Sequence, residues 1–289
     1  MHAWPSRTGL TIVSVLAAIT ALFCLNASAD QSSILARWYQ NVGERVPGET
    51  FGSFLGRVGV ARLDTPYGHA SDPRGSETLS VELRHFECVS FLESSLAVAR
   101  CAWRGEPTQE CFVWEVMGFR YRSGLMANYA SRLHYFADWL EDNGGRWRLN
   151  NVTGELGGRP VKRDFFYLTR RASKAPALAS SGERRAMAAI EGDLSSRSHY
   201  VLGRNDIRAA VNELQHGDLI AIVGNKPGRL ITHAGLIVRG EGDKARLLHA
   251  SSYHRRVVVT REDVADYVMR RPERAGIIVA RPLPPQETQ

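Results

Sequence analysis

A cysteine and two histidines are the residues of this sequence that could carry out nucleophilic chemistry. Cys88 stands at the start of a helical pattern, and His233 and His249 stand in apolar segments near the C-terminus. A thiol, an imidazole base and a third polar group that orients the imidazole are the minimum set for attack on an amide carbonyl. A histidine on its own is more often a structural residue, so this interpretation depends on whether the fold brings the three together.

The segment that follows Cys88 predicts a helix with one buried face. Leu92, Leu96, Ala99 and Trp103 recur at helical spacing. Cys88 falls in the first turn, where unpaired backbone N–H groups carry partial positive charge. Such groups can lower the pKa of a thiol below its ordinary value of about 8.5. A small buried side chain at a helix end explains the cysteine equally well on this segment alone.

The two histidines belong to a series of short apolar segments separated by Gly-rich turns. The segments cover residues 218–223, 232–238, 246–252, 256–260 and 276–280. This pattern is typical of an antiparallel meander, in which histidines on adjacent strands can lie side by side. If the Cys88 helix packs against this sheet, the thiol, an imidazole and a second polar group come together.

The N-terminal segment has the pattern of a secretory signal peptide. Arg7 precedes a mostly apolar run over residues 10–25, and the small residues 27–29 form an A-x-A cleavage site. The run is short for a membrane-spanning helix. We therefore expect cleavage of residues 1–29 and an exported protein, periplasmic or secreted, without stable membrane insertion.

Cysteine usage indicates one free thiol in the exported chain. After cleavage Cys88, Cys101 and Cys111 remain. The loop between the last two contains Gly105 and Pro107 and should turn back on itself, so we expect a Cys101–Cys111 disulfide. A free thiol at Cys88 then needs a reason in an oxidising periplasm, either burial or catalysis.

Composition and charge favour an envelope protein over a nucleic-acid-binding protein. The chain has 37 Lys and Arg against 30 Asp and Glu, a formal net charge of +7 at pH 7. This mild basic excess suits work near an anionic polymer. No dense basic block interleaves with aromatic residues, as a nucleic-acid interface would require, so we expect no nucleic-acid partner.

The order of these motifs resembles the NlpC-type cell-wall cysteine peptidases. After the cysteine come Gly-Asp-Leu from residue 217, His-Ala-Gly-Leu-Ile-Val from residue 233 and Leu-His-Ala-Ser-Ser from residue 248. A second block is similar to their N-acetylmuramoyl-L-alanine amidase-like family, formerly a domain of unknown function. It reads Arg-Tyr-Arg-Ser-Gly from residue 120 and Arg-Leu-His-Tyr-Phe-Ala-Asp-Trp from residue 132. The resemblance runs from residue 53 to residue 282.

The resemblance implies an α+β, papain-like fold in one catalytic domain, residues 30–289. In that fold a nucleophile helix packs on a small antiparallel β-sheet, here with a helical insertion. Carried onto this sequence, it implies Cys88 as nucleophile, His233 as base and His249 as the residue that orients the base. Many superfamily members have Asp before the cysteine, where this chain has Glu87. We expect no harm, because the carboxylate can still lie near the positive helix end.

The implied activity is hydrolysis of the amide between N-acetylmuramic acid and L-Ala through a cysteine thioester. Cleavage within the stem peptide by the same triad is one alternative, and non-catalytic peptidoglycan binding is another. The expected partner is peptidoglycan or a muropeptide, and the sequence leaves the oligomeric state open.

The block around residue 132 also has its own physical interpretation. Leu133, Phe136, Trp139 and Leu140 have helical spacing and should face the core. The polar groups around them form either a substrate wall or a structural hydrogen-bond network; they are Tyr121, Arg122, Arg132, His134, Tyr135 and Asp138. A His and an Asp four residues apart are too few ligands for a metal site, so we expect neither a metal nor a cofactor. Residues 172–198, rich in Ala, Ser and Arg, are interpreted as a surface excursion or lid.

Overall fold

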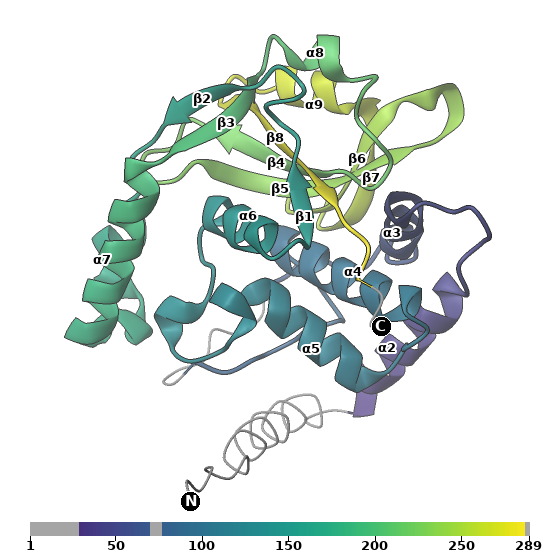
Figure 1. Ribbon diagram of the computed structural model, residues 1–289, viewed down its shortest axis with the longest axis horizontal. Coiled ribbons are helices and arrows are strands. Elements are labelled where there is room, and N and C mark those ends of the chain that lie inside the picture. The colour runs from purple at the N-terminus through teal and green to yellow at the C-terminus, as the bar shows by residue number, and fades with distance from the viewer. Residues whose placement is uncertain (1–28, 70–76, 287–289) are drawn as a thin grey trace, which may run out of the picture.

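Helices dominate the first half of the chain and an antiparallel sheet dominates the second half (Figure 1). The computed structural model describes residues 29–69 and 77–286, so the predicted signal peptide lies outside the described residues except for Ala29, the first residue of α2. The α-helices are α2 (Ala29–Val42), α3 (Phe51–Val60), α4 (Cys88–Trp103), α5 (Gln109–Arg120), α6 (Phe136–Gly145), α7 (Ser181–Ser196), α8 (Ile207–Ala210) and α9 (Val264–Met269). None of the helices in these ranges is long and apolar enough to cross a membrane.

Short 3₁₀ helices occupy several of the connections. They are η1 (Arg122–Gly124), η2 (Tyr129–Ser131), η3 (Thr169–Lys174), η4 (Pro176–Ala179) and η5 (Glu241–Asp243). The first two lie between α5 and α6, so the block that resembles the amidase-like family is a tight turn followed by a helix.

The sheet is antiparallel at every strand pair of the described chain. Its strands are β1 (Leu149–Asn151), β2 (Arg159–Lys162), β3 (Ser198–Gly203), β4 (Leu219–Gly224), β5 (Ile231–Arg239), β6 (Ala245–Ser251), β7 (Arg256–Asp263) and β8 (Arg274–Pro282). The order is β2-β3-β8-β4-β5-β6-β7, and β1 also pairs with β8. Four segments of the predicted meander are β4 to β7 in order, but the fifth is β8, which lies between β3 and β4 and not next to β7.

The sheet is larger than the small sheet that the resemblance implies, because β1, β2 and β3 extend it. The first two strands are short and mostly exposed, so they carry no run of alternating apolar residues. The mixed α+β class is confirmed. The size of the sheet is corrected to eight strands in the described chain.

The segment interpreted as a surface excursion contains a regular helix. Helix α7 lies between β2 and β3, and Ser180 caps it by accepting a hydrogen bond from the backbone N–H of Gly182 at 3.2 Å. Met187 and Leu194 are buried on one face of α7, while most of its other residues are exposed. The segment is therefore a helical insertion, seen at the edge of the molecule in Figure 1.

Helix α4 packs between the other N-terminal helices and one face of the sheet. Of the expected apolar positions, Leu92, Leu96 and Ala99 are buried, as is Phe91, while Trp103 at the end of the helix is only partly buried. Each large apolar side chain buried in this way contributes about 1.5–3 kcal/mol to folding. Successive side chains of β4 belong alternately to two hydrophobic clusters. Leu219 packs in the cluster that contains α4, and Ile220 packs in the second cluster, on the opposite face of the sheet. This packing fixes the first residue of α4 against the sheet.

A disulfide ties α4 to α5. Cys101 and Cys111 are bonded, with their Cα atoms 5.9 Å apart. Closing a short loop in this way typically contributes about 2–4 kcal/mol to stability. Among the described cysteines, Cys88 is free.

Candidate active site

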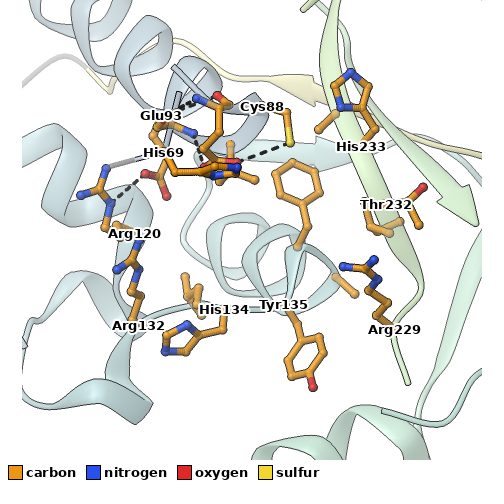
Figure 2. A pocket seen from close by; sticks show the side chains of 18 of the residues that line it. His69, Cys88, Glu93, Arg120, Arg132, His134, Tyr135, Arg229, Thr232 and His233 are labelled. Atoms are coloured by element: carbon orange, nitrogen blue, oxygen red, sulfur yellow. Dashed lines mark hydrogen bonds and ion pairs between the residues drawn. The ribbon is translucent and has the colours of Figure 1, made fainter. Parts of the chain in front are cut away.

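A cavity of about 630 Å³ lies where α4 meets the sheet. Its described lining comes from the segment before α4, the first turns of α4, the end of α5, the segment that leads into α6, the insertion before α7 and the start of β5. Cys88 and His233 both line it, and Figure 2 shows the thiol at the end of α4 facing the strand that carries His233. The cavity therefore contains the predicted nucleophile and base.

Cys88 is held at the first position of α4 by a capping box. The carboxylate of Glu87 accepts a hydrogen bond from the backbone N–H of Ser90 at 3.1 Å, and the hydroxyl of Ser90 accepts one from the N–H of Glu87 at 3.1 Å. The other carboxylate oxygen of Glu87 lies 3.6 Å from Sγ of Cys88 and accepts from the thiol. Glu87 is thus both the helix cap and the thiol's hydrogen-bond partner.

The pKa of Cys88 is raised, not lowered. Burial is the largest cause, and the negative charge of Glu87 adds to it. The backbone N–H groups of Ala234 and Val89 act in the opposite direction but are outweighed. The expectation of a thiolate favoured by the helix N-terminus is therefore wrong for the free protein, because a first-turn position does not reveal burial or the neighbouring carboxylate.

His233 and His249 form a hydrogen-bonded pair across adjacent strands. Nε2 of His233 on β5 lies 2.5 Å from Nδ1 of His249 on β6, and the two rings stand nearly perpendicular at 78°. Gly235 allows this approach, because a Cβ there would come within 2.9 Å of the Cβ of His249 and 2.7 Å of the carbonyl oxygen of Leu248. The glycine in the His-Ala-Gly motif therefore makes room for the second histidine.

The hydrogen bond leaves Nδ1 of His233 available. A neutral imidazole has one N–H, so His233 can act as a base only when its Nε2–H donates to Nδ1 of His249. The proton of His249 then lies on Nε2, which is buried without a hydrogen-bond partner. The ring of Tyr267 packs edge-to-face against that of His249, with the centroids 5.5 Å apart and the planes at 68°. Tyr267 therefore helps to hold the ring of His249 in place.

Both histidines are neutral at pH 7. Burial, together with the positive charge of Arg274, lowers the pKa of His233 to about 4. Burial and the neighbouring His233 lower the pKa of His249 to about 2. With the pKa of Cys88 raised, the resting state is a neutral thiol beside a neutral imidazole. Attack by this thiol on a substrate would therefore require transfer of its proton to a base in the same step.

Half of the predicted substrate-wall residues line the cavity. Arg132, His134 and Tyr135 are among its lining residues. The ring nitrogen Nε2 of His134 lies 2.8 Å from the carbonyl oxygen of Tyr129, and the hydroxyl of Tyr135 donates to the buried carboxylate of Glu191. These contacts hold the two side chains in place on the wall.

The other half of the predicted wall lies outside the cavity. Tyr121 is fully buried and donates to Glu77 at 2.7 Å, while Arg122 and Asp138 form an ion pair at 2.5 Å. These three residues match the structural alternative, a hydrogen-bond network that fixes the turn before α6. The structure does not bring them to the cavity.

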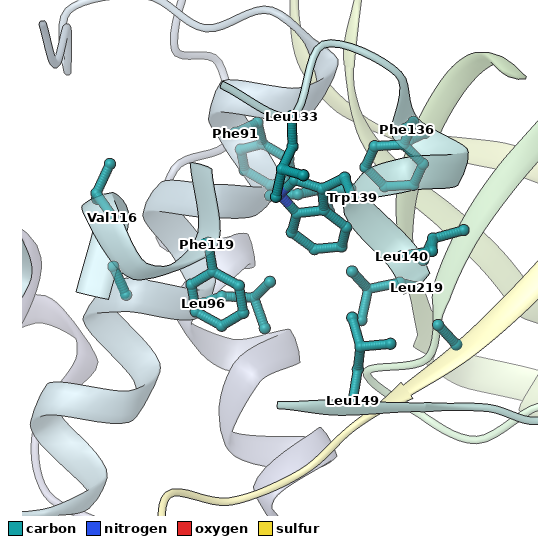
Figure 3. Packing of buried hydrophobic residues seen from close by; sticks show 14 of the residues in the cluster. Phe91, Leu96, Val116, Phe119, Leu133, Phe136, Trp139, Leu140, Leu149 and Leu219 are labelled. Carbon is teal, nitrogen blue, oxygen red and sulfur yellow. The ribbon is translucent and has the colours of Figure 1, made fainter. Parts of the chain in front are cut away.

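The apolar face predicted for the same block is confirmed. Leu133, Phe136, Trp139 and Leu140 are buried against α4 and α5 (Figure 3). The ring of Trp139 stacks on Phe136 at 4.8 Å. This packing holds the wall of the cavity to the nucleophile helix.

Other residues of the site carried no clear sequence signal. Tyr67 is one of them: burial raises the pKa of its hydroxyl, and a negative charge on Cys88 or Glu87 would raise it further. It reaches the site through an isolated parallel bridge to Phe86, just before α4, and no residue spacing reveals such a bridge. Arg229 also lines the cavity. It lies in a segment before β5 for which the sequence predicts a turn but no functional role. The described residues contain no cluster of three or more His, Cys, Asp or Glu that could hold a metal ion.

The fold is that of amidase-like α+β proteins. The chain belongs to the AmiA-like family, described as N-acetylmuramoyl-L-alanine amidase-like, which matches residues 57–277. The predicted family is confirmed, and membership implies a hydrolase.

Solved structures agree with this membership. An N-acetylmuramoyl-L-alanine amidase from Bacteroides uniformis is 27% identical with a TM-score of 0.75, over 80% of this chain and 98% of that one. A protein from Bacteroides fragilis, provisionally named a xylanase, is 29% identical with a TM-score of 0.70, over 77% and 98% of the two chains. The Legionella pneumophila protein LPG0564, assigned to DUF1460, shares the fold at 16% identity and a TM-score of 0.64, over 88% and 94%. A comparison with curated proteins gives no significant match.

Proposed function

We propose that this protein is an exported peptidoglycan amidase that hydrolyses the bond between N-acetylmuramic acid and L-Ala through a thioester on Cys88. The observation that carries the proposal is one cavity lined by a free thiol at a helix N-terminus and by His233, whose ring is hydrogen-bonded to His249 behind it. The name of the family and of the Bacteroides uniformis amidase support the choice of bond.

The proposed reaction begins from the neutral pair. Nδ1 of His233 accepts the thiol proton as Sγ of Cys88 attacks the lactyl carbonyl carbon. Unpaired backbone N–H groups in the first turn of α4 stabilise the negative charge on the carbonyl oxygen. The imidazolium then donates its proton to the amine of L-Ala, the C–N bond breaks, and the lactyl group remains as a thioester.

Hydrolysis of the thioester regenerates the protein. His233 accepts a proton from water, the resulting hydroxide adds to the thioester carbon, and the thiolate leaves and is reprotonated by the imidazolium. His249 acts through His233, because its Nδ1 accepts from Nε2 at 2.5 Å and holds the ring in place. The papain-like assignment rests on this same arrangement of helix, sheet and histidine.

Export is part of the proposal. The signal-like pattern of residues 1–29 supports it, and so does the Cys101–Cys111 disulfide. Disulfides persist in oxidising compartments and are rare in the cytosol. Peptidoglycan lies in the same compartment.

Glycosidase chemistry fits the cavity less well. Such enzymes use two carboxyl groups across the scissile bond. Of the acidic residues in the described lining, Glu82 pairs with Arg84 at 2.7 Å and Glu93 with Arg120 at 2.8 Å. Glu87 caps α4 and contacts the thiol.

Mass spectrometry of a defined muropeptide after incubation tests the proposal. We expect free N-acetylmuramic acid and an intact stem peptide, and no products with Cys88→Ala. A shortened stem would show a stem-peptide endopeptidase instead. Binding without turnover by the wild type would show a non-catalytic peptidoglycan-binding protein.

A further inference from the structure

The arginines that line the described part of the cavity differ in their partners. Arg120 forms an ion pair with Glu93 at 2.8 Å, and Arg132 lies 3.8 Å from Glu77. Arg229 forms neither an ion pair nor a hydrogen bond with any described residue. Its positive charge on the cavity wall is therefore not compensated by a described acidic side chain.

The side chain of Arg229 is held in place although its N–H groups are unused. The guanidinium lies over the ring of Tyr167, 4.6 Å from the ring centroid. The carbonyl oxygen of Gly228 accepts from the backbone N–H groups of Phe166 and Tyr167, at 3.2 Å each, which ties this turn to the insertion. Nε of Arg229 is buried without a hydrogen-bond partner. A buried N–H without a partner is costly, and a ligand that accepts from it removes that cost.

Arg229 lies on the same wall as the proposed base. It precedes His233 by four residues, and Figure 2 shows Arg229 beyond Thr232 along the segment that leads into β5. Strand β5 begins at Ile231, so residues 229 and 233 are separated by at most about 13 Å, the span of four extended residues. Two extended residues of a peptide substrate span about 7 Å, and the long arginine side chain can cover the remainder. A group two residues beyond the scissile bond is therefore within reach of Arg229.

We propose that Arg229 binds the free α-carboxylate of the second stem-peptide residue, D-Glu, and so makes the cavity selective for an acidic muropeptide. The inference rests on the proposed amidase function. In a γ-linked stem the D-Glu nitrogen is acylated by L-Ala, and its α-carboxylate stays free, two residues from the scissile carbonyl. A guanidinium offers that carboxylate paired N–H donors in a fixed plane.

Two muramyl dipeptides that differ in one group test the inference. They are N-acetylmuramoyl-L-Ala-D-Glu and N-acetylmuramoyl-L-Ala-D-isoglutamine, in which a carboxamide replaces the α-carboxylate. We expect the wild type to favour the acid by about tenfold or more in kcat/KM. Arg229→Gln should bring the ratio close to one, and Arg229→Lys, which keeps the charge without the planar fork, should leave an intermediate ratio.

A matched control is available in the same insertion. Arg170 is exposed, stacks on Phe166 at 3.8 Å and is not part of the cavity lining. Arg170→Gln removes the same charge from the chain and should leave the ratio at its wild-type value. Equal rates for the two dipeptides with the wild type, or an undiminished preference in Arg229→Gln, would overturn the inference.

A binding measurement separates this inference from the proposed function. Calorimetry with Cys88→Ala and each dipeptide should give about tenfold tighter binding of the acid. The double variant Cys88→Ala/Arg229→Gln should lose that difference. If the wild type does not cut the lactyl amide, the amidase proposal fails while the calorimetry still decides the carboxylate site. Equal binding of both dipeptides to Cys88→Ala would overturn the site even in an active amidase.

Discussion

The carboxylate of Glu87 should control the acidity of the nucleophile. Glu87→Gln removes the negative charge 3.6 Å from Sγ of Cys88. The amide oxygen of Gln can still accept from the backbone N–H of Ser90, which holds the helix start at 3.1 Å. The substitution therefore changes the charge beside the thiol with little change in capping.

The size of the effect follows from the distance. Two unit charges 3.6 Å apart interact by about 1 kcal/mol in water and about 4–5 kcal/mol at an effective dielectric constant of 20. Glu87 and Cys88 are half-buried, so we expect a loss of repulsion of about 1–3 kcal/mol. Removing a negative charge favours the thiolate, so the pKa of the thiol should fall by about one to two pH units.

The assay is the rate of inactivation by iodoacetamide as a function of pH, since the thiolate is the reacting form. The midpoint for Glu87→Gln should lie below that of the wild type. Glu87→Asp keeps both the charge and a good N-cap and should stay closer to the wild type. A midpoint for Glu87→Gln that does not move, or moves upward while thermal unfolding is unchanged, would refute the role assigned to this carboxylate.

The remaining predictions concern the thiols and the histidine pair. Cys88→Ala should abolish turnover with an unchanged circular dichroism spectrum, and activity within tenfold of the wild type would contradict the mechanism. His233→Ala should lower kcat/KM by about a thousandfold or more, and a larger loss in His249→Ala than in His233→Ala would exchange the two roles. His249→Asn should keep more activity than His249→Ala, because its amide can still form a hydrogen bond with the imidazole of His233. Because the pKa of His233 is about 4 and only the neutral imidazole accepts a proton, kcat/KM should hold as the pH falls to about 5 and decline below it; a decline centred near the ordinary histidine value of about 6.5 would contradict this. Iodoacetamide labelling without reduction should reach Cys88 alone, and labelling of Cys101 or Cys111 would contradict their disulfide.

The parts of the fold that the sequence predicted are those whose apolar pattern is continuous. Strand β4 is buried along its whole length and was recognised from its apolar run. Strand β2 has no buried residue. It is a strand because it pairs with β3, and its own residues show no alternating apolar pattern. Helix α7 was missed for a related reason: Met187 and Leu194 have helical spacing, but the buried position between them is Glu191, which a hydropathy pattern counts as exposed.

The candidate site was likewise predicted only in part. The types and order of Cys88, His233 and His249 could be read from the chain, because the family resemblance fixes them. The direction of the pKa shift of the Cys88 thiol could not be predicted from the sequence, since it depends on burial and on where the carboxylate of Glu87 points. Tyr121 was placed on the substrate wall, but its side chain points into the core. Sequence spacing does not say to which side of a turn a side chain points.

The position of β8 determines when the sheet can be completed. This strand, Arg274–Pro282, is the last of the described chain, yet it lies between β3 and β4 and also pairs with β1. Helix α4 and both strands that carry the histidines precede it in the chain, so they are synthesised first. Until β8 arrives, β3 and β4 both present open edges, which are prone to pairing with other chains. We therefore expect the sheet that carries the two histidines to be completed only after β8 has been synthesised and has paired with β3 and β4.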